Sequence, residues 1–197
     1  MAQTRTPTAM TTSDSAALSA RPAAAVWAWA ALVLALVGTA GSVYLTVGLG
    51  LKACPLCYYQ RAFMMAAFAV LAVGLLADRG QAGLYCTLAL APVAAGLGVA
   101  GYHAYLVHTG RMVCPDGVLG LGTAPDQSLA SFVLVAAAAL LGVVTAPQRG
   151  GRLALGVALS VVVGAALTWG SLASSLGHSY PPPADATDIC QSVRKTP

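Results

Sequence analysis

Long apolar stretches separated by short polar segments dominate the pattern of this 197-residue chain. Five of these stretches approach the roughly 20 residues that a helix needs to cross a lipid bilayer. They cover residues 24–48, 59–77, 82–107, 128–146 and 153–176. The pattern therefore predicts an all-α membrane protein, built as a bundle of five transmembrane helices.

The polar segments indicate how the helices connect and where the bundle ends. Residues 78–81 join the second and third spans and residues 147–152 join the fourth and fifth, so both pairs should form antiparallel hairpins. Residues 1–23 lack the apolar core of a secretory signal, and we expect them to form a poorly ordered cytoplasmic tail. Residues 24–177 are then the transmembrane domain, and 178–197 a second, extracytoplasmic tail that contains a cysteine.

The amino-acid composition agrees with a membrane protein and argues against a nucleic-acid-binding protein. Hydrophobic residues make up 58% of the chain, charged residues only 8%, and the mean hydropathy is +0.76. Soluble domains contain about 25% charged residues, so most of this chain does not meet water. The ten basic residues are scattered and form no run. This distribution gives no support to nucleic-acid binding.

The cysteines orient the chain better than its charges do. With the N-terminus in the cytoplasm, five basic residues fall on each side of the membrane, so the positive-inside rule does not decide. The same orientation places Cys54, Cys57, Cys114 and Cys190 outside the cell, where disulfides persist. We therefore predict a cytoplasmic N-terminus, with the redox cysteines and the C-terminus extracytoplasmic.

A pair of thiols, Cys54-Pro55-Leu56-Cys57, stands at the start of the second span. Pro55 suits the first turn of a helix, which would put Cys54, Cys57 and Arg61 on one face. The positive helix terminus and the arginine both favour the thiolate, which is the form that attacks disulfides. The alternatives are an inert structural disulfide or half of a zinc site. The chain lacks a second Cys-x-x-Cys or a fitting histidine pair to complete four zinc ligands.

The eight residues from Cys54 to Arg61, Cys-Pro-Leu-Cys-Tyr-Tyr-Gln-Arg, resemble the Cys-x-x-Cys-x-Tyr-x-Arg signature of the disulfide bond formation protein B (DsbB) family. The resemblance covers roughly residues 24–146. It implies an oxidoreductase of the bacterial cytoplasmic membrane with four core helices, to which this chain adds a fifth C-terminal span. It also implies two partners: a thioredoxin-like extracytoplasmic thiol oxidase, which the enzyme reoxidises, and a quinone, either ubiquinone or menaquinone, which it reduces.

The same resemblance implies roles for individual residues. Cys57 would be the thiolate that faces the quinone, and Cys54 the one that exchanges with a second cysteine pair. Arg61 would be the cation on the quinone side. His103, in the Tyr102-His103 pair near the end of the third span, would lie by the quinone ring as hydrogen-bond donor or proton relay. The alternative for His103 is a histidine hydrogen-bonded at the level of the lipid headgroups.

The family relays electrons through a second cysteine pair in the loop between the third and fourth spans. Here that loop, about 108–127, contains only Cys114, and the remaining extracytoplasmic cysteine is Cys190, beyond the fifth span. We predict that these two cysteines form the relay disulfide. A purely structural disulfide, or two free thiols that act between chains, are the alternatives. Cys86, early in the third span, is expected to be buried and without a redox role.

The resulting prediction is a membrane thiol:quinone oxidoreductase, and three rival functions stay open. A vitamin K epoxide reductase-like enzyme would also couple dithiols to quinones, but its Cys-x-x-Cys is expected after the loop cysteines rather than before them. A disulfide-braced scaffold or a transporter is the non-enzymatic rival, although the spans contain almost no ionisable residue for an ion pathway. Electron flow in the reverse direction, delivering reducing power outward, is the third.

Overall fold

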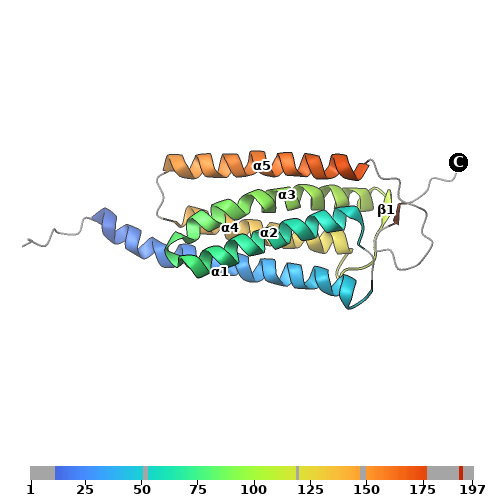
Figure 1. Ribbon diagram of the computed structural model, residues 1–197, viewed down its shortest axis with the longest axis horizontal. Helices are drawn as coiled ribbons and strands as arrows, with labels where there is room; N and C mark the ends of the chain where they lie inside the picture. Colours follow the sequence, from blue (N-terminus) through green and yellow to red (C-terminus); the bar gives the residue numbers. More distant parts are fainter. Residues whose placement is uncertain (1–11, 51–52, 119, 147–149, 177–190, 193–197) are drawn as a thin grey trace, which may run out of the picture.

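The computed structural model describes residues 12–50, 53–118, 120–146, 150–176 and 191–192. Over this part of the chain it is an almost entirely helical structure (Figure 1). The five long helices are α1 (Thr12–Val47), α2 (Pro55–Ala77), α3 (Ala82–His108), α4 (Ala124–Val144) and α5 (Gly150–Leu176). A short 3-10 helix, η1 (Arg79–Gln81), links α2 to α3, and two short strands are β1 (Met112–Val113) and β2 (Gln191–Ser192).

All five predicted spans are confirmed as helices, and each is long and apolar enough to cross a membrane. The chain is therefore an all-α, multi-pass membrane protein. Four of the helices, all except α3, start earlier than the apolar pattern indicates, and for α1 and α2 the reason lies in the sequence. Helix α2 begins at Pro55, because proline is accepted at the first helical position. Helix α1 begins at Thr12, so the second half of the predicted N-terminal tail is helical, as its high alanine content favours.

Helix α3 is the centre of the bundle, and it contacts each of the other four long helices. The fifth helix, α5, lies along the top of the view in Figure 1 and packs mainly on α3. Hydrogen bonds attach α5 to that neighbour, because Ser160 Oγ donates to Thr87 O at 3.0 Å and Thr168 Oγ1 donates to Ala95 O at 3.2 Å. Such bonds between helices are one of the forces that hold bundles together within lipid.

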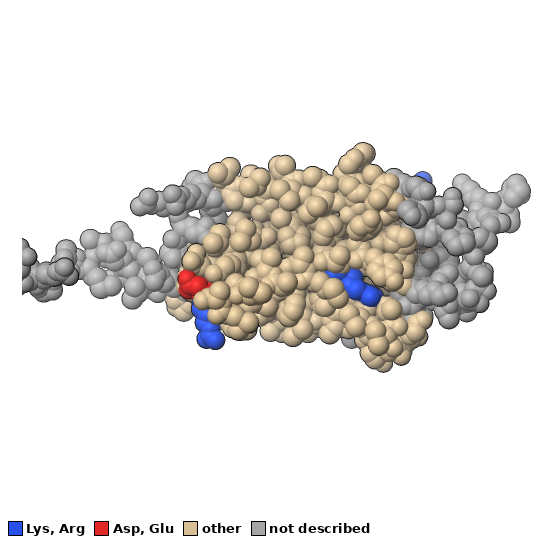
Figure 2. Space-filling model, viewed as in Figure 1, with Lys and Arg blue, Asp and Glu red and all other residues tan. Residues whose placement is uncertain are grey.

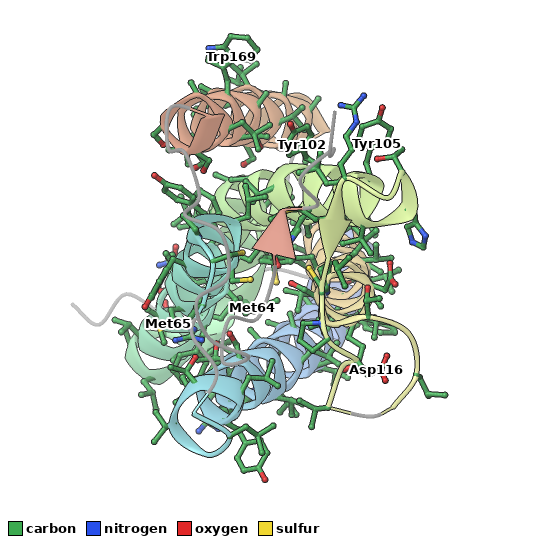
Figure 3. The ribbon with its side chains drawn as sticks, turned by 90° about the vertical axis from the view of Figure 1, so that its right-hand side faces the viewer. Met64, Met65, Tyr102, Tyr105, Asp116 and Trp169 are labelled. Atoms are coloured by element: carbon green, nitrogen blue, oxygen red, sulfur yellow. The ribbon has the colours of Figure 1, made fainter. Side chains whose placement is uncertain are left out.

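The side of the bundle is suited to lipid. On the face that Figure 2 shows, the described residues include few charged side chains, and these lie towards the two ends of the bundle. Large apolar side chains point outward along its length, among them Val162, Trp169 and Leu76. Figure 3 shows Trp169 directed away from the other helices, while Met64 points into the bundle. Because a membrane protein gains nothing by hiding apolar groups from lipid, this outward apolar surface agrees with the membrane assignment.

Close packing between α3 and α4 depends on Gly96, and it yields a test of the fold. A Cβ atom at this position would overlap the ring of Phe132, which is only 1% exposed. We expect Gly96→Ala to destabilise the protein by about 1–3 kcal/mol, because the ring has no free space to move into. Thermal unfolding in detergent measures the effect. Gly101→Ala on the same helix is the control, since its new Cβ would meet nothing within 4 Å. Equal melting temperatures for the two variants would contradict the packing.

The start of α2, the end of α3 and the strand pair meet at one end of the bundle, which we call the cysteine end and define by Cys54, Cys57 and Cys114 (right in Figure 1; facing the viewer in Figure 3). Strands β1 and β2 pair antiparallel there, with Val113 opposite Gln191. A segment near the C-terminus is thus brought beside the loop that follows α3.

Candidate functional site

The first two cysteines occupy the N-terminus of α2. Cys54 is the residue that caps the helix, and its Sγ accepts a hydrogen bond from the backbone N–H of Cys57 at 3.2 Å. The two sulfur atoms lie 2.8 Å apart, and both cysteines are free thiols. Cys54 is buried with Leu56, Val99 and Met112, whereas Cys57 is partly exposed. The predicted placement of Pro55 in the first turn is confirmed.

The surroundings of Cys54, just before the span of α2, favour its thiolate. A hydrogen bond with the Cys57 side chain, and next in effect the contact with His103, lower the pKa of Cys54 from 9.0 to about 5, against the opposing effect of burial. The partial positive charge of the helix N-terminus acts in the same direction as the hydrogen bonds. Cys54 is therefore negatively charged at neutral pH, which is the state required for attack on a disulfide.

This charge gives a prediction for the reduced protein. Because the pKa of Cys54 is lowered, the thiolate persists as the pH falls below neutral and is lost only near pH 5. We expect the thiolate absorbance in the ultraviolet, measured as the difference between dithiol and disulfide forms, to titrate with a midpoint near pH 5. Cys54→Ala cannot form the disulfide, so for this variant the absorbance of the reduced protein is followed directly against pH, and it should lack that step. A first midpoint near the value of an ordinary thiol, about 8.5, would contradict the arrangement.

Arg61 lies one turn beyond Cys57 and is held against α1. Its Nε donates to Ser42 Oγ at 3.0 Å, while Nη2 donates to Ser42 O at 2.8 Å and to Thr46 Oγ1 at 2.7 Å. The guanidinium also lies 5.8 Å from the ring centroid of Tyr58. None of these partners is a carboxylate, so they orient the guanidinium without cancelling its charge. Arg61 is thus a fixed cation beside the partly exposed thiol.

His103 lies completely buried between the cysteines rather than at the surface. Its Nδ1 is 3.0 Å from Gln60 Nε2, and its Nε2 is 3.5 Å from Cys114 Sγ and 4.0 Å from Cys54 Sγ. His103 is therefore hydrogen-bonded inside the bundle and is not exposed. The role beside a quinone ring stays a prediction, and the contacts that the structure gives this imidazole are with sulfur atoms and one amide.

Of the predicted second cysteine pair, only Cys114 lies within the residues that the structure describes. Cys114 directly follows β1, is half-buried, and takes part in a disulfide. The other cysteines with described positions, Cys54, Cys57 and Cys86, are free. Cys190 lies outside the described residues, and its role in the relay stays a prediction. Cys86 is buried near the start of α3, about 25 Å along the helix from His103.

The sulfur atoms of Cys54 and Cys57 and a ring nitrogen of His103 lie within 4.8 Å of one another, which is close enough to hold a metal ion. The contact with Gln60 weighs against such a site. An amide nitrogen only donates hydrogen bonds, so Nδ1 of the neutral ring is the acceptor and Nε2 bears the proton. A metal ligand needs a free lone pair on the nitrogen that faces the metal. Because Nε2 bears the proton, the two cysteines and His103 are arranged for a hydrogen bond from the ring to sulfur rather than for binding a metal ion.

Two contributions to this end of the molecule were not anticipated from the sequence. One is Gln60, whose place inside the eight-residue signature was a signal that could have pointed to it. The other is α5, which borders a cavity of about 360 Å³ beside the start of α2. The cavity is lined by Pro55, Tyr58, Tyr59, Ser174 and Ser175, and Tyr59 Oη is hydrogen-bonded to Ser174 Oγ at 2.7 Å.

Comparison with known proteins agrees with this geometry. The family described as "Disulfide bond formation protein DsbB" matches residues 22–131, from the first span into α4. No curated protein and no solved structure is similar enough to count as a match. Helix α5 and Cys190 lie beyond the matched range. Because the match covers more than half of the 197 residues and includes the dithiol signature, the chain belongs to the DsbB family, the membrane oxidoreductases of disulfide bond formation.

Proposed function

We propose that this protein is a thiol:quinone oxidoreductase that reoxidises a thioredoxin-like extracytoplasmic disulfide-forming protein. Electrons would pass through Cys114–Cys190 and then Cys54–Cys57 to ubiquinone or menaquinone. The observation that supports this most directly is the dithiol at the N-terminus of a membrane helix, with Arg61 one turn further into the span. A dithiol in this position lies where the aqueous phase and the lipid phase meet.

The strand pair supports the proposed relay disulfide. Strands β1 and β2 are antiparallel, with Val113 opposite Gln191. If this register continued by one position, Cys114 would lie opposite Cys190, and directly opposed strand residues are close enough for a disulfide. The disulfide state of Cys114 agrees with that pairing. The relay would then join the α3–α4 loop to the segment after α5.

The residues next to Cys57 fit a quinone. Arg61 offers a positive charge and hydrogen-bond donors to a carbonyl oxygen, and the exposed ring of Tyr58 offers an aromatic surface. Cys57 is partly exposed on the same side of α2, so its sulfur would be the protein atom that contacts the quinone. When bound, the quinone accepts two electrons and two protons and so carries the electrons away into the lipid phase.

The chain itself would perform two kinds of step. A thiolate of the partner attacks the Cys114–Cys190 disulfide, and the reduced pair then exchanges with Cys54–Cys57. The exchange leaves an electron pair on Cys57, which would then act as the nucleophile, and the Cys54 thiolate, 2.8 Å from the sulfur of Cys57, is placed to close the disulfide. Formation of the Cys54–Cys57 disulfide releases the two electrons.

We further propose that the protein lies in the bacterial cytoplasmic membrane with its N-terminus inside and its cysteine end outside. The support is the segregation of the cysteines. Cys54, Cys57 and Cys114 lie together at the cysteine end, whereas Cys86, towards the opposite end, is a buried free thiol. An oxidising compartment on one side of the membrane suits this division.

The proposed function is tested with purified protein in lipid vesicles that contain ubiquinone or menaquinone. A thioredoxin-like oxidase in its reduced form is the electron donor, and loss of quinone absorbance is followed. We expect turnover that requires both donor and quinone. Absence of turnover by the wild type with either quinone, while the protein remains folded, would contradict the proposal and favour a scaffold.

The role of Arg61 is measured in the same assay. We expect Arg61→Met to raise the KM for quinone by about 10- to 100-fold, because it removes a charge-assisted hydrogen bond and an uncancelled cation. The matched control is Arg79→Met, at the opposite end of the bundle, where Arg79 lies 5.7 Å from the ring centroid of Trp29. Equal KM values for the two variants would place the quinone away from Arg61.

A further inference from the structure

His103 lies between the two cysteine centres, and its position suggests a function in the exchange between them. Its Nε2 is within 4.0 Å of both Cys54 Sγ and Cys114 Sγ. Among the described side chains of α3, His103 is the one that makes polar contacts with both sulfur atoms. We propose that His103 is a catalytic residue of the exchange between the two disulfide centres, where its Nε2–H donates to whichever sulfur carries the negative charge. This inference rests on the proposed function.

The proton on Nε2 is held there by the neighbouring helix. Gln60 Nε2, on α2, is 3.0 Å from Nδ1, and an amide nitrogen is always a donor. Nδ1 must therefore accept, and the neutral ring presents its only N–H to the sulfur atoms. Both Gln60 and His103 are buried, at 6% and 0% exposure, so water does not compete for these hydrogen bonds. Gln60 thus acts as a positioning residue for the imidazole.

The exchange can be written with all electrons assigned. The Cys114 thiolate attacks Cys54 Sγ in the Cys54–Cys57 disulfide, so that a Cys114–Cys54 bond forms and the electron pair leaves on Cys57. The Cys190 thiolate then attacks Cys114, a Cys114–Cys190 bond forms, and the pair leaves on Cys54. One dithiolate is oxidised, one disulfide is reduced, and no proton is gained or lost.

During these steps the negative charge leaves Cys114 and later arrives on Cys54. A hydrogen bond to a charged sulfur is stronger than one to a neutral thiol, so a donor near both atoms stabilises the charge at each stage. His103 needs no large movement to serve both sulfurs, because its Nε2 is 3.5 Å from one and 4.0 Å from the other. The exchange between the centres is therefore the step that should depend on the ring.

The test measures the two steps separately in intact protein. The exchange is followed without quinone: a pulse of the reduced thioredoxin-like partner reduces the second pair, and rapid alkylation with mass analysis reports reduction of Cys54–Cys57. Quinone reduction is followed alone in a Cys114→Ser background, where dithiothreitol reduces Cys54–Cys57 directly. His103→Leu removes the donor, and His103→Gln keeps an amide N–H. His108→Leu, at an exposed position on the same helix, is the matched control.

We expect His103→Leu to slow the exchange by about 10- to 100-fold relative to His108→Leu, in keeping with loss of a hydrogen bond to a charged group. His103→Gln should recover most of that loss, and the quinone step should change far less than the exchange in either variant. An unchanged exchange rate in His103→Leu would overturn the inference. So would an equal slowing of the quinone step, which would place His103 at the quinone instead.

Loss of quinone reduction and loss of the exchange are separate outcomes of these assays. If the wild type performs the exchange but reduces neither quinone, the proposed function fails while the effect of His103 on the exchange is still measured. If His103→Leu disturbs folding, Gln60→Leu decides instead, because it leaves the ring in place and removes the contact that holds the proton on Nε2. Gln60→Leu gives an independent readout. This substitution should lower the exchange rate and alter the ¹⁵N chemical shifts that report the tautomer of His103. A purely structural role of Gln60 would leave those chemical shifts unchanged.

Discussion

Cys57→Ser is expected to reduce quinone turnover by on the order of 1000-fold or more, with any dithiol donor. A serine hydroxyl can neither form a disulfide with Cys54 nor transfer the electron pair, and loss of an essential nucleophile has effects of this size. Quinone absorbance in lipid vesicles, with wild type and variant at equal concentration, measures the loss.

Cys86→Ala is the control for this substitution. Cys86 is a buried free thiol about 25 Å along α3 from His103, and a buried thiol behaves as a small apolar group. Its replacement should leave turnover within about twofold of wild type. Substantial turnover by Cys57→Ser would remove Cys57 from the electron path and require another residue to face the quinone.

Cys190→Ser is expected to abolish turnover driven by the thioredoxin-like partner, because the second disulfide can no longer form. Dithiothreitol should restore quinone reduction, since a small dithiol can reduce Cys54–Cys57 directly and bypass the relay. The comparison of the two donors separates a defect in the relay from a defect at the quinone. Peptide mapping of the oxidised wild type without reductant should recover Cys114 linked to Cys190.

Two results would count against this relay. Partner-driven turnover that survives Cys190→Ser would reduce the second disulfide to a structural link. A disulfide between Cys114 residues of two chains, seen as a covalent dimer on a non-reducing gel, would mean that the second centre forms between molecules. Either outcome would still leave the Cys54–Cys57 pair as the centre that reduces the quinone.

The fifth helix is the main departure of this chain from the family match, which ends at residue 131. Hydrogen bonds from Ser160 and Thr168 to backbone carbonyls of α3 hold α5 on the central helix. The helix also returns the chain to the cysteine end, where β2 pairs with β1. We therefore expect its function to be delivery of Cys190 to the loop that contains Cys114.

The sequence by itself determined the membrane class, the five helices and the dithiol at the head of the second span. These features are local: a run of about 20 apolar residues must form a helix in lipid, because no water is present to satisfy its backbone groups. A proline one position after Cys54 marks the start of α2 in the same way. The signature from Cys54 to Arg61 also pointed to the family that the comparison then showed.

Only the tertiary structure decided how the neighbours of that dithiol are arranged. Gln60 and His103 are separated by 43 positions in the chain, and their contact depends on how α2 packs against α3. The partners of Arg61 on α1 depend likewise on the packing of two helices. Helix periodicity specifies which face of a helix a residue occupies, but it does not specify which polar group of the next helix lies opposite. That depends on the distance and rotation between neighbouring helices, which small residues such as Gly96 set. His103 therefore came to lie between sulfur atoms through packing that no local pattern encodes.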